Sequence, residues 1–165
     1  QLAILFQSIF YGVGQAVQPP VSENNGAKNF SRVHVFLRYA LVTAGITSLF
    51  FALFSELFPV QILHIYMKVS QAVLIAGPSI LRKYSFAFLF MGLNIVSSYY
   101  LQAVLKSFSS LTISLLRGCI LCVLFILLLP AIGGISLLWY AMPLAELFTF
   151  GVTAVLLKKS TAVKE

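Results

Sequence analysis

Residues 111–130 read LTISLLRGCILCVLFILLLP, an apolar run interrupted by a single charged side chain. A helix of about 20 mostly apolar residues is long enough to cross the hydrocarbon core of a bilayer. In hydrocarbon every backbone amide must be paired within the spanning structure, which leaves helices and closed barrels. Because polar and apolar positions do not alternate here, the run predicts a transmembrane helix that ends at Pro130.

The rest of the chain has the same apolar character. Of 165 residues, 60% are hydrophobic and 9% are charged, and the mean hydropathy is +0.99. A soluble domain keeps about a quarter of its residues charged, so a lipid bilayer is the predicted solvent. Four more spanning helices are predicted at about 1–18, 39–58, 84–104 and 134–157. The first is expected to stop at Pro19–Pro20, and the fold class is an all-α, polytopic membrane helix bundle with five transmembrane helices.

The basic residues predict the orientation of these helices. The net charge is +7, with 11 Lys and Arg against 4 acidic residues, and most basic residues lie between the apolar runs. There they meet anionic headgroups and orient the chain, so nucleic acid is not an expected partner. With five spans, eight of the 11 basic residues, Arg117 among them, fall on one side. The carboxy terminus is therefore predicted on the cytoplasmic side of the cytoplasmic membrane.

The stretch 60–83 is apolar enough to be considered as a sixth span, but it has Lys68 near its middle. A lysine at the centre of a spanning helix costs about 2.5–3.5 kcal/mol. With six spans the other ten basic residues would also divide evenly between the two sides. We therefore predict that residues 60–83 form an interfacial segment on the outer face.

A distinctive stretch, GVGQAVQPPVSENNGAKNFSRV, occupies residues 12–33. It predicts a helix with one flexible side formed by Gly12 and Gly14. The helix is expected to stop at Pro19, and a polar turn is expected to follow. In that turn Asn25 and Gly26 are expected to supply positive-φ conformations. A phosphate-binding loop does not fit, because the glycines lie within an apolar helix and no strand or P-loop lysine accompanies them.

The pattern G-x-x-Q-x-x-Q-P followed by S-x-N-x-G-A-K, within residues 12–28, resembles the multidrug and toxic compound extrusion (MATE) family. The stretches LFMGLNIVSSYYLQAV, SLLRGCILCVLFILLLP and GGISLLWYAMPLAELFTFGV are similar to the family's tenth, eleventh and twelfth helices. The resemblance implies that residues 1–165 are a single partial lobe of a twelve-helix, two-lobe transporter. The missing amino-terminal lobe of the same chain would then be a partner, together with the lipid bilayer and a small organic substrate.

The implied activity is secondary active efflux, in which drugs or small organic compounds are exchanged for a coupling ion, H⁺ or Na⁺. The family is thought to place its coupling acids in the amino-terminal lobe or in the seventh and tenth helices. The stretch similar to the tenth helix contains Asn94 but no acid, so no coupling residue carries over. Two alternatives stay open: a flippase for lipid-linked saccharides, which would need a strongly basic cavity, and a non-transporting membrane subunit.

Glu146 is the clearest candidate for transport chemistry, because an ionisable side chain at membrane depth is expensive and often functional. It lies near the middle of the last predicted helix, three residues after Pro143. The missing amide of Pro143 can kink that helix. Glu146 is expected either to exchange a proton during transport or to pin two helices together through hydrogen bonds.

Neutral polar and aromatic residues add further candidates for the substrate or ion pathway. Asn94 is expected to bond substrate or, preferably, another helix. Gln15 and Gln18 share one helix face at i, i+3 spacing and could line a cavity or pack. Tyr99 could stack on flat cationic drugs or anchor an interface. Separately, Ala40, Ala44 and Ser48 form a stripe of small residues suited to close helix packing.

No cofactor, metal site or enzymatic activity is predicted. Cys119 and Cys122 have C-x-x-C spacing, but neither a second pair nor a nearby histidine accompanies them, so they are expected to act as small packing residues. A Ser–His–acid constellation is also missing from the sequence pattern.

Overall fold

The computed structural model describes residues 1–66 and 70–162, and within these ranges it contains helices and no strand. The α-helices are α1 (Leu2–Gly26), α2 (Phe30–Leu57), α3 (Pro59–Tyr66), α4 (Gln71–Ala103), α5 (Ser107–Leu115), α6 (Leu121–Gly133) and α7 (Ala141–Ala162). A π-helical turn, η1 (Leu116–Ile120), joins α5 to α6, and a 3₁₀ helix, η2 (Ile135–Tyr140), precedes α7. The predicted all-helical class is confirmed.

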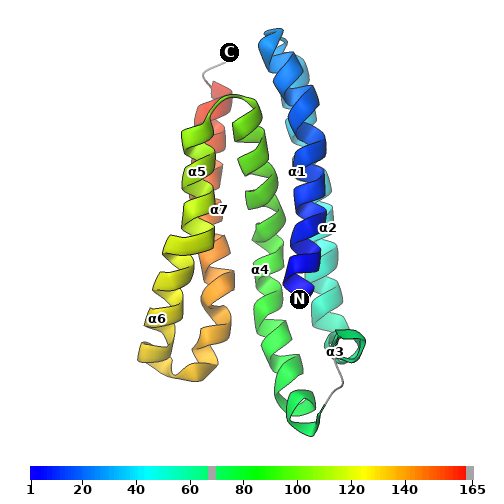
Figure 1. Ribbon diagram of the computed structural model, residues 1–165, viewed down its shortest axis with the longest axis vertical. Helices are drawn as coiled ribbons and strands as arrows, with labels where there is room; N and C mark the ends of the chain where they lie inside the picture. Colours follow the sequence, from blue (N-terminus) through cyan, green and yellow to red (C-terminus); the bar gives the residue numbers. More distant parts are fainter. Residues whose placement is uncertain (67–69, 163–165) are drawn as a thin grey trace.

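The long helix α4 is the centre of the bundle. In Figure 1 it stands between α1 and α2 on one side and the α5–α6 rod and α7 on the other, and it contacts α1, α2, α5 and α7. Many large apolar side chains point outward, including Ile46, Phe50 and Leu127, which are 59–70% exposed. Such an exterior suits lipid rather than water.

Four helical segments are long and apolar enough to cross a membrane, and they cover 30–57, 73–103, 107–133 and 135–161. Helix α1 has 25 residues but is not among them. Glutamines and serines, such as Gln7, Ser8 and Gln15, dilute its apolar character. The predicted count of five transmembrane helices is therefore not confirmed, although a fifth long helix lies in the bundle.

Prolines end fewer helices than we expected. Helix α1 continues through Pro19 and Pro20 to Gly26, and α6 continues past Pro130 to Gly133. A proline removes one backbone hydrogen bond, but neighbouring polar groups can compensate inside a membrane bundle. In α1 the two prolines leave the carbonyls of Gln15 and Ala16 without a helical donor. The side-chain amide of Asn24 donates to the Pro20 carbonyl at 2.8 Å, which adds a bond to the turn that follows the prolines. Pro59, by contrast, follows the end of α2 and begins α3, where a missing amide costs least.

The turn between α1 and α2 also differs from the prediction. Asn25 and Gly26 form the last turn of α1, and the positive φ of 57° is at Lys28. The Lys28 and Asn29 amides donate to the carbonyls of Asn25 and Asn24, at 3.1 and 2.8 Å. The left-handed position thus falls at Lys28 instead of Gly26, and the hydrogen bonds to the helix-end carbonyls offset the cost of that conformation for a residue with a side chain.

The predicted interfacial segment, residues 60–83, is largely helical. Its first part is α3, and from Gln71 onward it belongs to α4, which begins well before residue 84 and contains Pro78. Lys68, which decided against a sixth span, lies outside the described residues. The location of this segment at the membrane surface stays a prediction.

Two packed regions hold α1 and α2 against α4. Near the start of α1, Phe6 stacks on Phe51 with ring centroids 3.8 Å apart, and its edge meets Phe88 at 4.8 Å. Nearer the middle, the small residues of α2 that we predicted as a packing stripe are buried against α1 and α4: Ala40, Ala44 and Ser48. A Cβ at Gly92 of α4 would collide with Ser48 and Phe10, so these backbones approach closely, as membrane helices do.

Candidate functional site

The side chain of Glu146 is completely buried. It lies in the second turn of α7, just after η2 ends at Tyr140 and the chain becomes α-helical at Ala141. Pro143 lies in the first turn of α7, where its missing amide is tolerated. Pro143 thus lies just after the change from 3₁₀ to α geometry, inside the continuous helical segment 135–161. A kink at Pro143 stays a prediction.

Arg117 of η1 supplies the positive charge that compensates Glu146. Its Nη2 and Nε atoms donate to the same carboxylate oxygen, Oε1, at 2.7 and 3.1 Å. The arginine side chain is 12% exposed and the glutamate 0%. Removing one partner of such a buried pair costs about 3–5 kcal/mol, because the other charge is left uncompensated.

Asn94 of α4 holds the carboxylate from the other side. Its Nδ2 atom donates to Glu146 Oε2 at 2.7 Å and to the Glu146 backbone carbonyl at 2.9 Å. The structure thus brings Asn94 and Glu146 together across two helices, in the interhelical arrangement that we preferred. Asn94 Oδ1 has no hydrogen-bond partner among the described residues. Together, Asn94, Arg117 and Glu146 form what we call the carboxylate cluster.

Arg117 is the functional candidate that sequence reasoning missed. We had counted it among the charges that orient the chain, although it lies inside the apolar run 111–130. The argument that singled out Glu146, an ionisable group at membrane depth, applies equally to Arg117. The π-helical geometry around it could not be foreseen, yet it matters, since π turns inside α-helices often mark functional sites. Figure 1 shows the α5–α6 rod bending at this turn.

Arg117 also lines a cavity of about 260 Å³. We call it the tyrosine cavity, because Tyr11 of α1 and Tyr99 of α4 form one wall, with ring centroids 6.3 Å apart and planes at 65°. The Tyr11 hydroxyl also interacts with the guanidinium of Arg117. The remaining lining residues come from α4, α5 and η1: Ile95, Ser98, Gln102, Ser114, Arg117 and Gly118.

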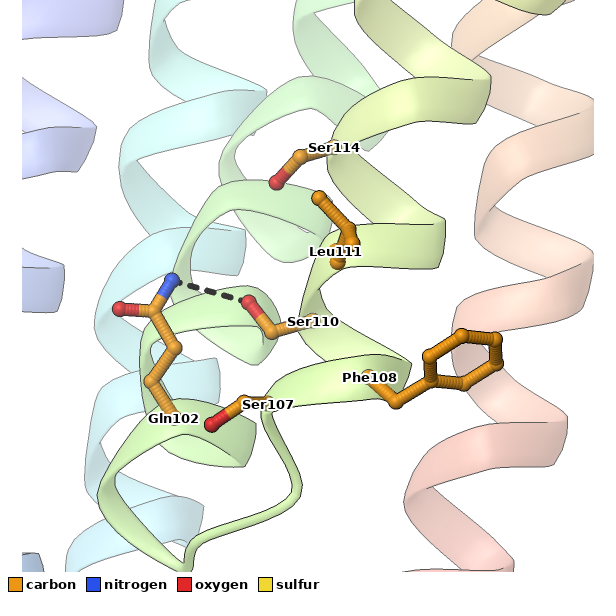
Figure 2. A pocket seen from close by; sticks show the side chains of 6 residues that line it. All are labelled: Gln102, Ser107, Phe108, Ser110, Leu111 and Ser114. Atoms are coloured by element: carbon orange, nitrogen blue, oxygen red, sulfur yellow. Dashed lines mark hydrogen bonds between the residues drawn. The ribbon is translucent and has the colours of Figure 1, made fainter.

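A second, larger groove of about 580 Å³ lies between α4 and α5. Figure 2 shows Gln102 and Ser110 pointing toward each other across it, and Gln102 Nε2 donates to Ser110 Oγ at 2.9 Å. The Ser98 and Ser110 hydroxyls are 2.6 Å apart. This groove shares Gln102 and Ser114 with the tyrosine cavity. Its lining residues are Gln102, Ser107, Phe108, Ser110, Leu111 and Ser114.

The two glutamines that we paired on α1 have different surroundings in the structure, and a role in lining a cavity stays a prediction for Gln15. Gln18 reaches α4, where its Nε2 donates to Gln102 Oε1 at 3.1 Å. Gln15 is exposed and belongs to neither set of lining residues. Of the two wall glycines, Gly12 faces open space, whereas a Cβ at Gly14 would collide with the ring of Tyr99. Gly14 therefore allows Tyr99 to lie against α1.

Within the described residues, no three His, Cys, Asp or Glu side chains gather in a way that could hold a metal ion. Cys119 is exposed and Cys122 half-buried, and both are free thiols. The site itself presents one carboxylate, one guanidinium, amides, hydroxyls and aromatic rings.

Comparisons with known proteins give the broader context of this site. The family model MatE matches residues 1–128. A solved MATE multidrug transporter, DinF-BH in complex with rhodamine 6G, is 30% identical, and the match covers 96% of this chain and 35% of that one, with a TM-score of 0.87. An inward-facing multidrug resistance MATE family transporter of the MOP superfamily has the same TM-score at 17% identity, over 99% of this chain and 38% of that one. No curated protein matches the sequence. The chain thus spans a little over a third of these transporters.

Proposed function

The chain belongs to the MatE family, and from this premise we propose that it forms most of one lobe of a secondary active transporter. The complete transporter would have two lobes and twelve transmembrane helices, and these residues would supply five of them. It would export drugs or other small organic compounds across the cytoplasmic membrane in exchange for H⁺ or Na⁺. The carboxy terminus would lie on the cytoplasmic side.

The observation that carries this proposal is the likeness to DinF-BH, at 30% identity over 96% of the chain. That transporter was solved in complex with the rhodamine dye, which suggests an organic compound as the cargo here as well. In two-lobe transporters the lobes rock about a central site, and ligands shift the balance between inward-open and outward-open states. The rest of the transporter would provide the opposing lobe.

Within this lobe, the carboxylate cluster is the strongest candidate for coupling. Glu146 is a buried carboxylate on α7 whose partners come from α4 and η1. A change in the ligand of that carboxylate would alter contacts among three elements at once. Ionisable residues at membrane depth that pair with one another often mark ion or substrate pathways. The choice between H⁺ and Na⁺ as the coupling ion stays open.

The test is export by the full-length gene product in a host that lacks its own drug pumps. We expect cells that express it to accumulate less of the rhodamine dye than cells with an empty vector, with membrane expression confirmed by immunoblot. Equal accumulation in the two strains would contradict export and would favour a non-transporting membrane subunit.

A flippase for lipid-linked saccharides is less well supported. Pyrophosphate-linked cargo calls for uncompensated basic side chains in the cavity. The tyrosine cavity has one arginine among its lining residues, and Glu146 already neutralises it. A lipid-flipping assay with proteoliposomes would separate the two functions.

A further inference from the structure

Building on the proposed export function, we propose that the tyrosine cavity binds a small organic cation and that Arg117 is a tethered competitor for the carboxylate of Glu146. In the structure the guanidinium occupies that carboxylate, at 2.7 and 3.1 Å. A cation that reaches Glu146 displaces Arg117, and Arg117 returns when the cation leaves. The carboxylate therefore has a positive partner both when the cargo is bound and when it is absent.

The first support is that the carboxylate is held without the help of Arg117. Asn94 donates to Glu146 Oε2 and to the Glu146 backbone carbonyl, at 2.7 and 2.9 Å, while Arg117 uses only Oε1. If Arg117 swings away, the Asn94 contacts still fix the position of the carboxylate. Exchange at Glu146 therefore keeps the link between α4 and α7 and changes the link between η1 and α7.

The second support is that Arg117 is the member of the cluster that borders open space. Its side chain is 12% exposed, whereas Glu146 and Asn94 are completely buried. Arg117 also lines the tyrosine cavity, whereas Glu146 is not among the lining residues. A cation in the cavity therefore meets Arg117 before it can reach Glu146.

The third support is the chemistry of the cavity walls. Tyrosine rings attract organic cations through their π faces, and such rings recognise quaternary ammonium groups in other proteins. Tyr11 and Tyr99 supply two rings, and Gln102, Ser98 and Ser114 supply neutral polar groups. A volume of about 260 Å³ limits the ligand to a small cation. The uncompensated charge that would meet it, once Arg117 turns away, is the negative charge of Glu146.

A purely structural role is a weak explanation for the pair. Replacing a buried ion pair by well-packed apolar residues is often neutral or stabilising, and intramembrane charges are expensive to keep. Asn94 already joins α4 to α7 through Glu146. The role left for Arg117 is to control what else binds the carboxylate.

The experiment measures binding to the purified full-length transporter. The probes are N-methylacridinium, a flat fluorescent cation, and acridine, its uncharged parent at mildly alkaline pH. In the Arg117→Gln variant the competing charge is gone, so the affinity for N-methylacridinium should rise at least about tenfold, because contacts between close charge pairs are worth more than that factor. The affinity for acridine should not change. Glu146→Gln should remove the preference for the cation.

The matched control is Arg82→Gln in the exposed pair of Arg82 and Glu56. Arg82 is 55% exposed and is not among the residues that line the tyrosine cavity. This variant should alter neither the affinity for N-methylacridinium nor the affinity for acridine. If Arg117→Gln leaves N-methylacridinium binding unchanged or weaker, the competitor role is wrong. Should that variant fail to fold, Arg117→Lys takes its place. A lysine lacks the guanidinium fork, so the affinity for the cation should rise by a smaller factor. No rise would overturn the inference.

Binding and export can fail independently. Loss of dye export in cells, with cation binding that behaves as described, would refute the proposed function and leave the cavity assignment intact. Normal export combined with an Arg117→Gln variant that binds the cation no better would refute the competitor role alone.

Discussion

Two arginine–glutamate pairs in the described part of the chain use the same residue types and have little else in common. Arg117 Nη2 lies 2.7 Å from Glu146 Oε1, and the two side chains are 12% and 0% exposed. Arg82 Nε lies 3.9 Å from Glu56 Oε1, and these side chains are 55% and 45% exposed. Water or headgroups can solvate the second pair if the partners separate. The first pair is shielded from solvent, so its charges must always have a partner. Position in the bundle, rather than residue type, decides what a pair can do.

The largest expected effect is on stability. Arg117→Gln or Glu146→Gln should each lower the free energy of unfolding by about 3–5 kcal/mol, whereas Arg82→Gln or Glu56→Gln should cost about 0–1 kcal/mol. The measurement is thermal unfolding of the full-length protein in detergent. The double variant Arg117→Gln, Glu146→Gln should recover much of the loss, since no uncompensated charge remains. Equal losses of unfolding free energy at the two pairs would mean that burial does not set the contribution of each pair to stability.

The second prediction concerns export. Glu146→Gln should lower the rate of rhodamine efflux roughly tenfold or more, which corresponds to about 1.4 kcal/mol or more of lost stabilisation. Glu56→Gln, the same change at the exposed pair, should export normally at matched membrane expression. Wild-type efflux by the Glu146 variant would remove this residue from the mechanism.

The third prediction addresses the polar neighbour of each carboxylate. Asn94→Leu removes hydrogen bonds to the Glu146 carboxylate and carbonyl, so it should destabilise by about 1.5–3 kcal/mol. Ser85 bonds Glu56 Oε2 at a longer 3.3 Å, and Ser85→Ala should cost about 0.5–1.5 kcal/mol. Unfolding midpoints of the two variants, measured side by side, test this order. A reversed order would mean that Asn94 does not hold Glu146 as described.

The smallest expected effect comes from exchanging arginine for lysine, which keeps the charge. Arg117→Lys loses the two-atom contact with Glu146 Oε1 and should cost about 1 kcal/mol, since one ammonium cannot reproduce the fork. Arg82→Lys should be neutral within error in the same unfolding assay. A neutral Arg117→Lys would show that charge alone, without guanidinium geometry, is enough.

Much of the fold could be predicted because its causes are local or compositional. Continuous apolar runs with few charges require helices in a bilayer, and the small residues Ala40, Ala44 and Ser48 identified a packing face of α2 correctly. Helix ends were less predictable. Pro19–Pro20 and Pro130 lie inside α1 and α6 rather than at their ends, and whether a helix continues past a proline depends on packing with neighbours that one sequence does not reveal.

The candidate site could be predicted only in part. Glu146 and Asn94 stood out because polar groups at membrane depth need partners, but their pairing across 52 residues depends on how α4 and α7 rotate about their axes. Arg117 was counted among the charges that orient the chain in the membrane. In the structure it lies in the π-helical turn η1, which has about one more residue per turn than an α-helix, and its side chain bonds Glu146 of α7. Spacing placed Gln15 and Gln18 on one face of the helix, but it could not reveal that Gln18 hydrogen-bonds Gln102 of α4.

The two prolines of α1 have a mechanical consequence. Neither Pro19 nor Pro20 has an amide hydrogen, so the carbonyls four residues earlier, at Gln15 and Ala16, receive no helical hydrogen bond. Bending α1 at this level therefore breaks fewer backbone bonds than bending it elsewhere. The segment that carries Phe6 is clamped by aromatic packing on α2 and α4, so a change in the direction of α1 costs least beyond it, at the two prolines.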